Sequence, residues 1–124
     1  LTTNQHVLKK MTAAVDGEVK KTQVNGVLAL KKGSLLKNCF VKGPVSIGAG
    51  CRISNSVLGP YLSVGDGVTI TNCCLSRSLI FPNTRVKGVT LTNSILGERV
   101  QISGAAREER SYSLLIGADG VLNL

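Results

Sequence analysis

The most regular feature of this sequence is an aliphatic residue that recurs every five or six positions between residues 19 and 102. The position two residues before each of these anchors holds a small or aliphatic residue and never a charged one. Because side chains two positions apart on an extended chain point the same way, each step predicts a very short strand followed by a corner. The sixteen anchors are Val19, Val24, Leu30, Leu36, Val41, Ile47, Ile53, Leu58, Val64, Ile70, Leu75, Ile80, Val86, Leu91, Leu96 and Ile102.

Three consecutive steps add up to sixteen or seventeen residues, so every third anchor is expected to stack on the one below it. This spacing predicts an all-β fold of one domain, a triangular parallel β-solenoid of about five coils in which each strand pairs with its neighbours above and below. Four aromatic residues and no tryptophan agree with a narrow core of Val, Ile and Leu. The predicted columns are Val19, Leu36, Ile53, Ile70, Val86 and Ile102; Val24, Val41, Leu58, Leu75 and Leu91; and Leu30, Ile47, Val64, Ile80 and Leu96.

The beginning of the sequence departs from this rhythm. The segment NQHVLKKMTAA places Val7, Met11 and Ala14 at helical spacing and predicts a short amphipathic helix. We therefore expect an N-terminal linker helix within residues 1–16, followed by a β-helix domain over residues 17–124.

The end of the sequence departs from it as well. The segment GAAREERS breaks the spacing and predicts an exposed loop over residues 103–111. The segment SLLIGADGVLNL then restores the spacing through Ile116 and Leu122, which are six positions apart. Residues 112–124 are therefore expected to supply a closing strand.

The charge of the chain is strongly positive. The formal charge is +8, and eight of the fifteen basic residues lie in the first third of the sequence. Lys and Arg can neutralise phosphate, but the whole chain has only four aromatic residues that could stack on nucleic-acid bases. We therefore expect a solvated or anion-attracting surface rather than a nucleic-acid site. The eight residues are Lys9, Lys10, Lys20, Lys21, Lys31, Lys32, Lys37 and Lys42.

The sequence also carries signals about location. No apolar run approaches the length needed to cross a bilayer, and the opening LTTNQHVLKK contains no hydrophobic signal core. These features predict a soluble, cytoplasmic protein without a membrane partner. The chain does not begin with Met, and we expect it to be a piece of a longer protein.

The four cysteines are not spaced as zinc ligands. On a strand, the adjacent pair Cys73-Cys74 must face opposite ways. Cys39 and Cys73 share a face, yet Ser56 lies on the coil between them, and two strand spacings of about 10 Å exceed the reach of a disulfide. We expect Cys39, Cys51 and Cys73 to serve packing as free thiols in a reducing compartment.

Other candidate motifs do not assemble a reactive centre. Gly48-Ala49-Gly50 and Gly65-Asp66-Gly67 could suggest phosphate loops, but their separation of seventeen residues predicts that both lie at the same corner of adjacent coils. The single histidine, His6, precedes the coils. The acidic residues form no pair suited to acid–base or metal chemistry, so we predict no catalytic, cofactor-binding or metal-binding residue in this chain. These acidic residues are Asp16, Glu18, Asp66, Glu98, Glu108, Glu109 and Asp119.

Several segments resemble a known family. GPVSIGAGCRI, NSVLGPYLSVGDGVTI and SRSLIFPNTRVKGVTLTNSILGERVQI resemble the C-terminal left-handed parallel β-helix of the sugar-1-phosphate nucleotidylyltransferases, in particular the long form of the glucose-1-phosphate thymidylyltransferases. The opening LTTNQHVLKKM resembles the helix that joins that family's catalytic domain to its β-helix, and the tail LIGADGVLNL resembles its closing segment. The resemblance covers residues 4–124 and supplies the left hand of the winding, which the spacing alone cannot give.

The resemblance implies a parent enzyme in which a sugar 1-phosphate attacks the α-phosphate of a nucleoside triphosphate, with Mg²⁺ and release of pyrophosphate. In the thymidylyltransferases, dTTP and glucose 1-phosphate give dTDP-glucose. The family's G-x-G-T-R-type loop, catalytic lysine and metal-binding aspartates belong to an N-terminal domain without a counterpart in this sequence, so no catalytic residue is carried over. For this chain the resemblance implies homo-oligomer contacts, stability or regulation of that nucleotidyltransferase domain.

Two further functions stay open. Hexapeptide-repeat acyltransferases use the same coil, but they typically take a histidine from it, and His6 lies outside the coils. A stand-alone interaction module could instead use the basic first coils to hold an acidic partner.

Overall fold

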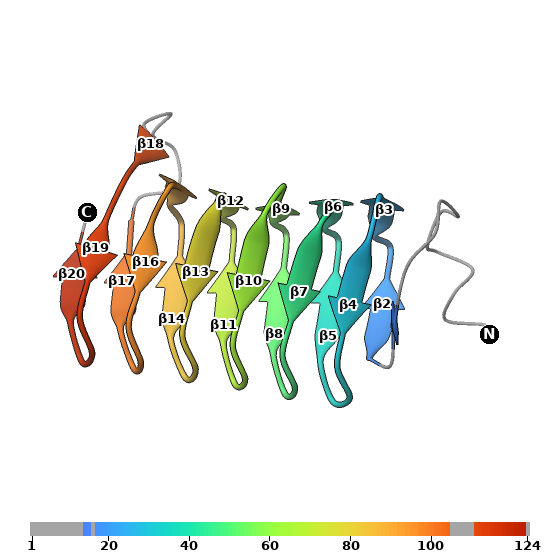
Figure 1. Ribbon diagram of the computed structural model, residues 1–124, viewed down its shortest axis with the longest axis horizontal. Coiled ribbons are helices and arrows are strands. Elements are labelled where there is room, and N and C mark those ends of the chain that lie inside the picture. The colour runs from blue at the N-terminus through green and yellow to red at the C-terminus, as the bar shows by residue number, and fades with distance from the viewer. Residues whose placement is uncertain (1–13, 16, 105–110, 124) are drawn as a thin grey trace.

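The computed structural model of this chain describes residues 14–15, 17–104 and 111–123. Its coils stack along one long axis, with β2 (Glu18–Lys20) near one end and β20 (Val121–Asn123) at the other (Figure 1). The described residues form strands and turns, and none of them belongs to a helix that could cross a membrane. The predicted all-β parallel solenoid is confirmed, with about six turns.

Each turn contributes one short strand to each of three parallel sheets, which we call A, B and C. Neighbouring strands within a sheet are three strands apart in sequence. Sheet A contains β1 (Ala14–Val15), β4 (Leu28–Leu30), β7 (Val45–Ile47), β10 (Leu62–Val64), β13 (Ser78–Ile80), β16 (Ile95–Leu96) and β19 (Leu115–Ile116). Sheet B contains β2, β5 (Leu35–Lys37), β8 (Arg52–Ser54), β11 (Thr69–Thr71), β14 (Arg85–Lys87), β17 (Gln101–Ser103) and β20. Sheet C contains β3 (Gln23–Asn25), β6 (Phe40–Lys42), β9 (Val57–Leu58), β12 (Cys74–Ser76), β15 (Thr90–Thr92) and β18 (Ser111–Tyr112).

The core follows the predicted columns. In sheet B, Ile70 pairs with Ile53 on one side and with Val86 on the other. All sixteen anchors are buried, none more than 4% exposed. The positions two residues before the anchors are buried too, except Gly17, which is half-buried. The aliphatic anchors therefore fill a continuous interior between the three sheets.

The coils wind in a left-handed sense, as the resemblance implied. In Figure 1 the chain runs down sheet A in the foreground and turns at the lower corners. It returns upward through sheet B behind and crosses sheet C at the top, while the coils advance from right to left. This winding leaves three flat outer faces, one for each sheet.

The corners require unusual backbone conformations. Between sheets B and C, Asn38, Asn55 and Asn72 have φ values of 55°, 52° and 54°. Asparagine tolerates this left-handed conformation better than most residues. The side-chain amide of Asn38 also donates a hydrogen bond of 3.2 Å to Oδ1 of Asn55 on the next coil. Between sheets A and B, Gly50 and Gly67 have φ values of 68° and 67°. The backbone N–H of Gly67 donates a hydrogen bond of 2.9 Å to the carbonyl oxygen of Ala49, which confirms that the two glycine-rich segments share one corner of adjacent coils.

Buried hydroxyl groups connect successive coils near the corners. The hydroxyl of Ser56 donates a hydrogen bond of 2.8 Å to the carbonyl oxygen of Ser54 and accepts one of 3.2 Å from the backbone N–H of Cys73. Among the described residues, no buried side-chain nitrogen or oxygen lacks a partner. Five more hydroxyls likewise accept a hydrogen bond from a backbone N–H of the following coil, namely those of Thr22, Ser34, Ser78, Thr84 and Ser94.

The two ends contain more strand than the sequence predicts. Within residues 112–124, expected to supply one closing strand, the structure has the end of β18 and all of β19 and β20, which pair with β15, β16 and β17. This extra turn explains why the solenoid has about six turns rather than five. Of the expected loop over residues 103–111, Ser103 ends β17 and Ser111 begins β18.

At the other end, the expected linker helix spans residues 1–16. Ala14 and Val15 of this segment form β1, which pairs with Ala29 and Leu30 of β4. The remaining residues of the linker, and residues 105–110, lie outside the described part of the chain.

Candidate functional site

The outward side chains distinguish the three faces. The residue directly before each anchor lies between two buried positions and points away from the core. On sheet A, Leu79 pairs with Ile95, and Ile95 pairs with Leu115. Their exposed fractions are 40%, 45% and 81%. We call these three residues the apolar stripe. The preceding coils carry polar or small residues at the same position, so the stripe is confined to one half of this face.

A shallow groove runs beside the apolar stripe. Its lining includes Tyr61, Arg77 and Asn93, which occupy the corner between sheets C and A on successive coils. Leu79 and Ile95 of the stripe also line the groove, which has a volume of about 600 Å³. The guanidinium carbon of Arg77 lies 5.8 Å from the centre of the Tyr61 ring, a cation–π geometry. A groove lined by both aromatic or aliphatic and polar side chains suits contact with another protein surface.

Sheet C carries a smaller apolar area in the equivalent position. Phe40 and Val57 pair across β6 and β9 and are 36% and 42% exposed. Cys74, the next outward residue, is exposed. The neighbouring outward residues in the column are Gln23 and Thr90, so polar side chains flank this area at both ends.

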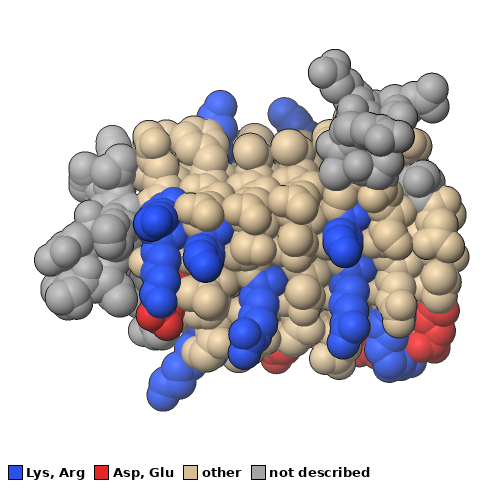
Figure 2. Space-filling model, turned by 180° about the vertical axis from the view of Figure 1, so that it is seen from behind, with Lys and Arg blue, Asp and Glu red and all other residues tan. Residues whose placement is uncertain are grey.

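Sheet B is the basic face. Figure 2 shows Lys and Arg side chains gathered over one side of the solenoid, and the outward residues of sheet B include Lys20, Lys37, Arg52, Arg85 and Lys87, all exposed. At one end of this face, Nζ of Lys20 lies 3.4 Å from a carboxylate oxygen of Glu18. The other described lysines of the first third lie at corners or strand ends and are exposed, namely Lys21, Lys31, Lys32 and Lys42.

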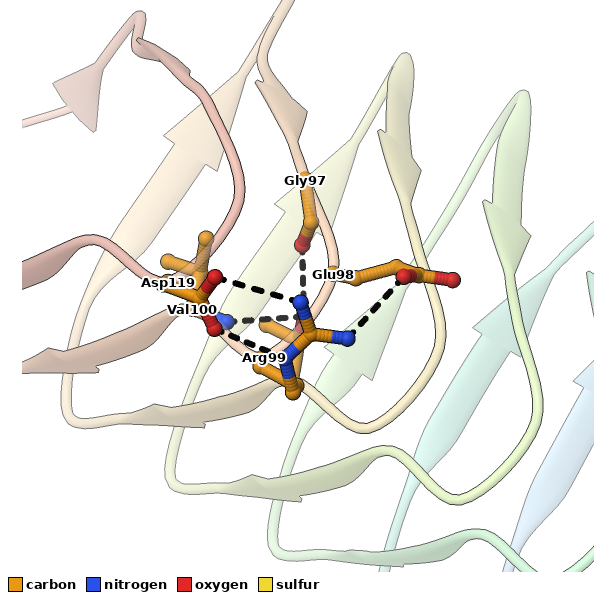
Figure 3. A network of polar contacts seen from close by, with 6 residues as sticks. Gly97, Glu98, Arg99, Val100 and Asp119 are labelled. Carbon is orange, nitrogen blue, oxygen red and sulfur yellow. Dashed lines mark hydrogen bonds and ion pairs between the residues drawn. The ribbon is translucent and has the colours of Figure 1, made fainter.

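A polar network joins the last turn to the one before it (Figure 3). Nε of Arg99 donates to Oδ1 of Asp119 at 2.7 Å, Nη2 donates to Oδ2 at 3.1 Å, and Nη1 donates to Glu98 at 3.1 Å. The hydrogen bond from Arg99 lowers the pKa of Asp119, and the same contact raises the pKa of Arg99. Because these groups are exposed and paired, the network connects coils and leaves no free group for acid–base chemistry.

The cysteines lie where the sequence predicts them. Cys39, Cys51 and Cys73 are buried in the core with free thiols, and Cys74 points outward. Burial raises the pKa of each of the three buried thiols above its ordinary value. These thiols are therefore protonated and pack as small apolar groups.

The described residues contain no group of three His, Cys, Asp or Glu side chains that could hold a metal ion. The Mg²⁺ implied by the resemblance thus finds no matching set of ligands in this part of the chain. His6 and the acidic residues Asp16, Glu108 and Glu109 lie outside the described residues.

Sequence reasoning missed the apolar stripe, although a signal was present. The triplets Ser78-Leu79-Ile80 and Ser94-Ile95-Leu96 place an aliphatic residue between two buried ones, where coils elsewhere carry Ser46 or Ser63. An outward aliphatic residue on successive coils is not needed by the fold. It therefore indicates a contact surface.

No protein-family model matches this chain, and no curated protein matches it significantly.

Proposed function

We propose that this chain is a self-associating β-helix domain whose apolar stripe packs against a second copy. We further propose that the domain belongs to a sugar-1-phosphate nucleotidylyltransferase. The observation that carries the first proposal is the exposed column Leu79, Ile95 and Leu115 on the flat face of sheet A. The resemblance of the coil segments to that family supports the second.

The apolar stripe has the features of an interface between copies. It lies on a face of stacked strands, and flat sheet faces pack against one another at about 10 Å. Burying each of its side chains against a partner would contribute on the order of 1 kcal/mol. Phe81 and Tyr61, 41% and 62% exposed, extend the apolar surface to both sides of the stripe. Aromatic and aliphatic residues of this kind form the centres of stable interfaces.

The partner is a second copy of the same chain because the surface is apolar and carries few charges. A strongly basic protein avoids its own copies through like-charge repulsion unless the contact excludes the charged surface. The basic residues of sheet B lie on a different face from the stripe. Two copies can therefore meet through sheet A while the sheet B faces remain apart.

Self-association is tested by light scattering of the chain over a range of concentrations. We expect an oligomer for the unmodified chain and a monomer for the double variant Leu79→Ser/Ile95→Ser. The matched control is Phe40→Ser/Val57→Ser, which removes two outward apolar side chains of similar exposure from sheet C and should leave the oligomer intact. A monomeric mass for the unmodified chain at high concentration would refute the proposal, as would equal behaviour of the two double variants.

In the proposed parent enzyme, the nucleotidyl transfer takes place in the N-terminal domain, and the β-helix holds subunits together. For a thymidylyltransferase the parent converts dTTP and glucose 1-phosphate to dTDP-glucose and pyrophosphate. Two measurements test this assignment independently of oligomer formation. The open reading frame should encode a G-x-G-T-R-like loop upstream of this segment, and the isolated segment should not turn over dTTP with glucose 1-phosphate. Turnover by the segment alone would contradict the assignment of catalysis to the N-terminal domain.

A further inference from the structure

The centre of sheet B combines positive charges with free hydroxyl groups. In one row, Arg52, Thr69 and Arg85 are consecutive partners across β8, β11 and β14. In the parallel row, Ser54 and Thr71 lie on the same strands as Arg52 and Thr69. We call Ser54, Thr69 and Thr71 the hydroxyl basin. Adjacent strands lie about 4.8 Å apart, so the Cα atoms of Arg52 and Arg85 are about 10 Å apart with the basin between them.

Two lysines complete this arrangement. Lys37 precedes Ser54 in the second row, and Lys87 follows Thr71. Arg52 and Lys37 thus lie on one side of the basin, and Arg85 and Lys87 lie on the other. Figure 2 shows this face, on which uncharged surface lies between neighbouring groups of Lys and Arg side chains.

The hydroxyl groups of the basin are available to a ligand. Ser54, Thr69 and Thr71 are half-buried, and none of their hydroxyls donates to a described residue. On sheet C, by contrast, the outer hydroxyls of Ser76 and Thr92 bond to each other at 3.4 Å. An unused hydroxyl on a surface lined by cations can donate a hydrogen bond to an anion.

The charged residues around the basin are mostly basic. Residues 19–65 contain seven basic residues and no acidic one. The next acidic residue, Asp66, lies at the corner before β11, where its Oδ1 accepts a hydrogen bond of 2.8 Å from the backbone N–H of Ala49. Within the described residues, no carboxylate forms an ion pair with the four cations around the basin. Their charge is therefore balanced by solvent ions or by a ligand.

We propose that sheet B binds a run of linked phosphate groups across the hydroxyl basin. Arginine guanidinium groups match the oxygens of phosphate in a two-pronged geometry, and lysine adds point charge. Serine and threonine hydroxyls donate to phosphate oxygens at protein surfaces that bind nucleic-acid backbones. Four cations favour a ligand with several negative charges over a single phosphate. Linked phosphates occur in a free oligophosphate and in a nucleic-acid backbone, and this binding goes beyond the self-association proposed above.

The proposal is tested by titrating the chain with inorganic tripolyphosphate and, separately, with a fluorescent single-stranded oligothymidylate at about 0.15 M salt, where charges more than about 8 Å apart are largely screened. We expect Arg52→Gln/Arg85→Gln to weaken binding by at least about tenfold, because two charge-assisted contacts are lost. We expect Thr69→Val/Thr71→Val, which changes no charge, to weaken it by about three- to tenfold. The control Lys32→Gln/Lys42→Gln removes the same charge outside the sheet B face and should change affinity less than about twofold.

Each outcome has a defined meaning. Binding of tripolyphosphate alone assigns the site to a free oligophosphate, and binding of the oligonucleotide alone assigns it to a nucleic-acid backbone. Binding of both with the same dependence on the variants shows recognition of the shared phosphate chemistry. The proposal is overturned if neither probe binds, if the threonine variant binds like the unmodified chain, if the control loses as much affinity as the arginine variant, or if poly-glutamate binds equally well. Thermal unfolding of every variant shows that a loss of binding is not a loss of fold.

Discussion

The central coils and the last turn belong to one solenoid but bury their inward side chains to different extents. Ile70, with coils on both sides, is 0% exposed, whereas Ile116 and Leu122 in the last turn are only half-buried. Tyr112 and Leu114 of the same turn are half-buried as well. In a solenoid each coil is covered by its neighbours, so a position's contribution to stability depends on how many neighbours it has.

The largest difference in stability is expected between variants of a central and a terminal isoleucine. Ile70→Ala should lower the free energy of unfolding by about 2–5 kcal/mol, because it removes buried methyl groups and leaves a cavity between Ile53 and Val86. Ile116→Ala should cost less than about 1 kcal/mol, because solvent already reaches the side chain. Urea unfolding of both variants measures the difference. Equal losses would show that the last turn is covered as well as the centre.

A smaller difference in stability is expected between variants of a buried and an exposed serine. Ser56→Ala leaves the buried backbone N–H of Cys73 without its acceptor and should cost about 1–3 kcal/mol. Ser113→Ala removes an exposed hydroxyl that donates to the carbonyl oxygen of Thr92 at 3.0 Å, and should cost less than about 0.5 kcal/mol. The shift in the urea midpoint of each variant provides the test. A neutral Ser56→Ala would mean that water or a shifted backbone replaces the hydroxyl.

The smallest effect concerns pH and the last turn. The pKa of Asp119 is lowered from 3.8 by its contact with Arg99, so the carboxylate adds stability above its unfolded pKa and loses it as the pH falls through the folded pKa. The protection factor of the Gln101 amide, which donates to the carbonyl oxygen of Gly120, should therefore fall as the pH is lowered, once the slowing of intrinsic amide exchange in acid is divided out. In Arg99→Gln this acid-dependent change should largely disappear. An unchanged acid response in that variant would assign the effect to another carboxylate.

Much of the fold could be predicted because its period is dictated by geometry. Ile53 and Ile70 must share a column once each coil takes seventeen residues, and the structure pairs them. The complete last turn was not predicted because its step is longer and because its sheet C anchor position holds Tyr112, which pairs with Leu91. An aromatic residue at an anchor falls outside a pattern defined by aliphatic residues.

The candidate surfaces were harder to predict from the sequence. The outward positions of Leu79 and Ile95 face solvent in the isolated chain, so the fold places no constraint on their identity, and the period of the buried anchors draws no attention to them. The bond between Arg99 and Asp119 joins residues twenty apart, a separation that the sixteen- and seventeen-residue coils do not predict. The hydroxyl basin depends on which coils lie side by side, which becomes visible only after the register is known.

The direction of the backbone hydrogen bonds has a mechanical consequence. The strands lie across the long axis of the molecule, so the bonds between coils run along it (Figure 1). A force that pulls β1 away from β20 would act along these bonds and would break the hydrogen bonds between one pair of coils after another. Such a chain would yield by unzipping a coil at a time at low force, whereas a squeezing force along the same axis would meet closely packed aliphatic layers.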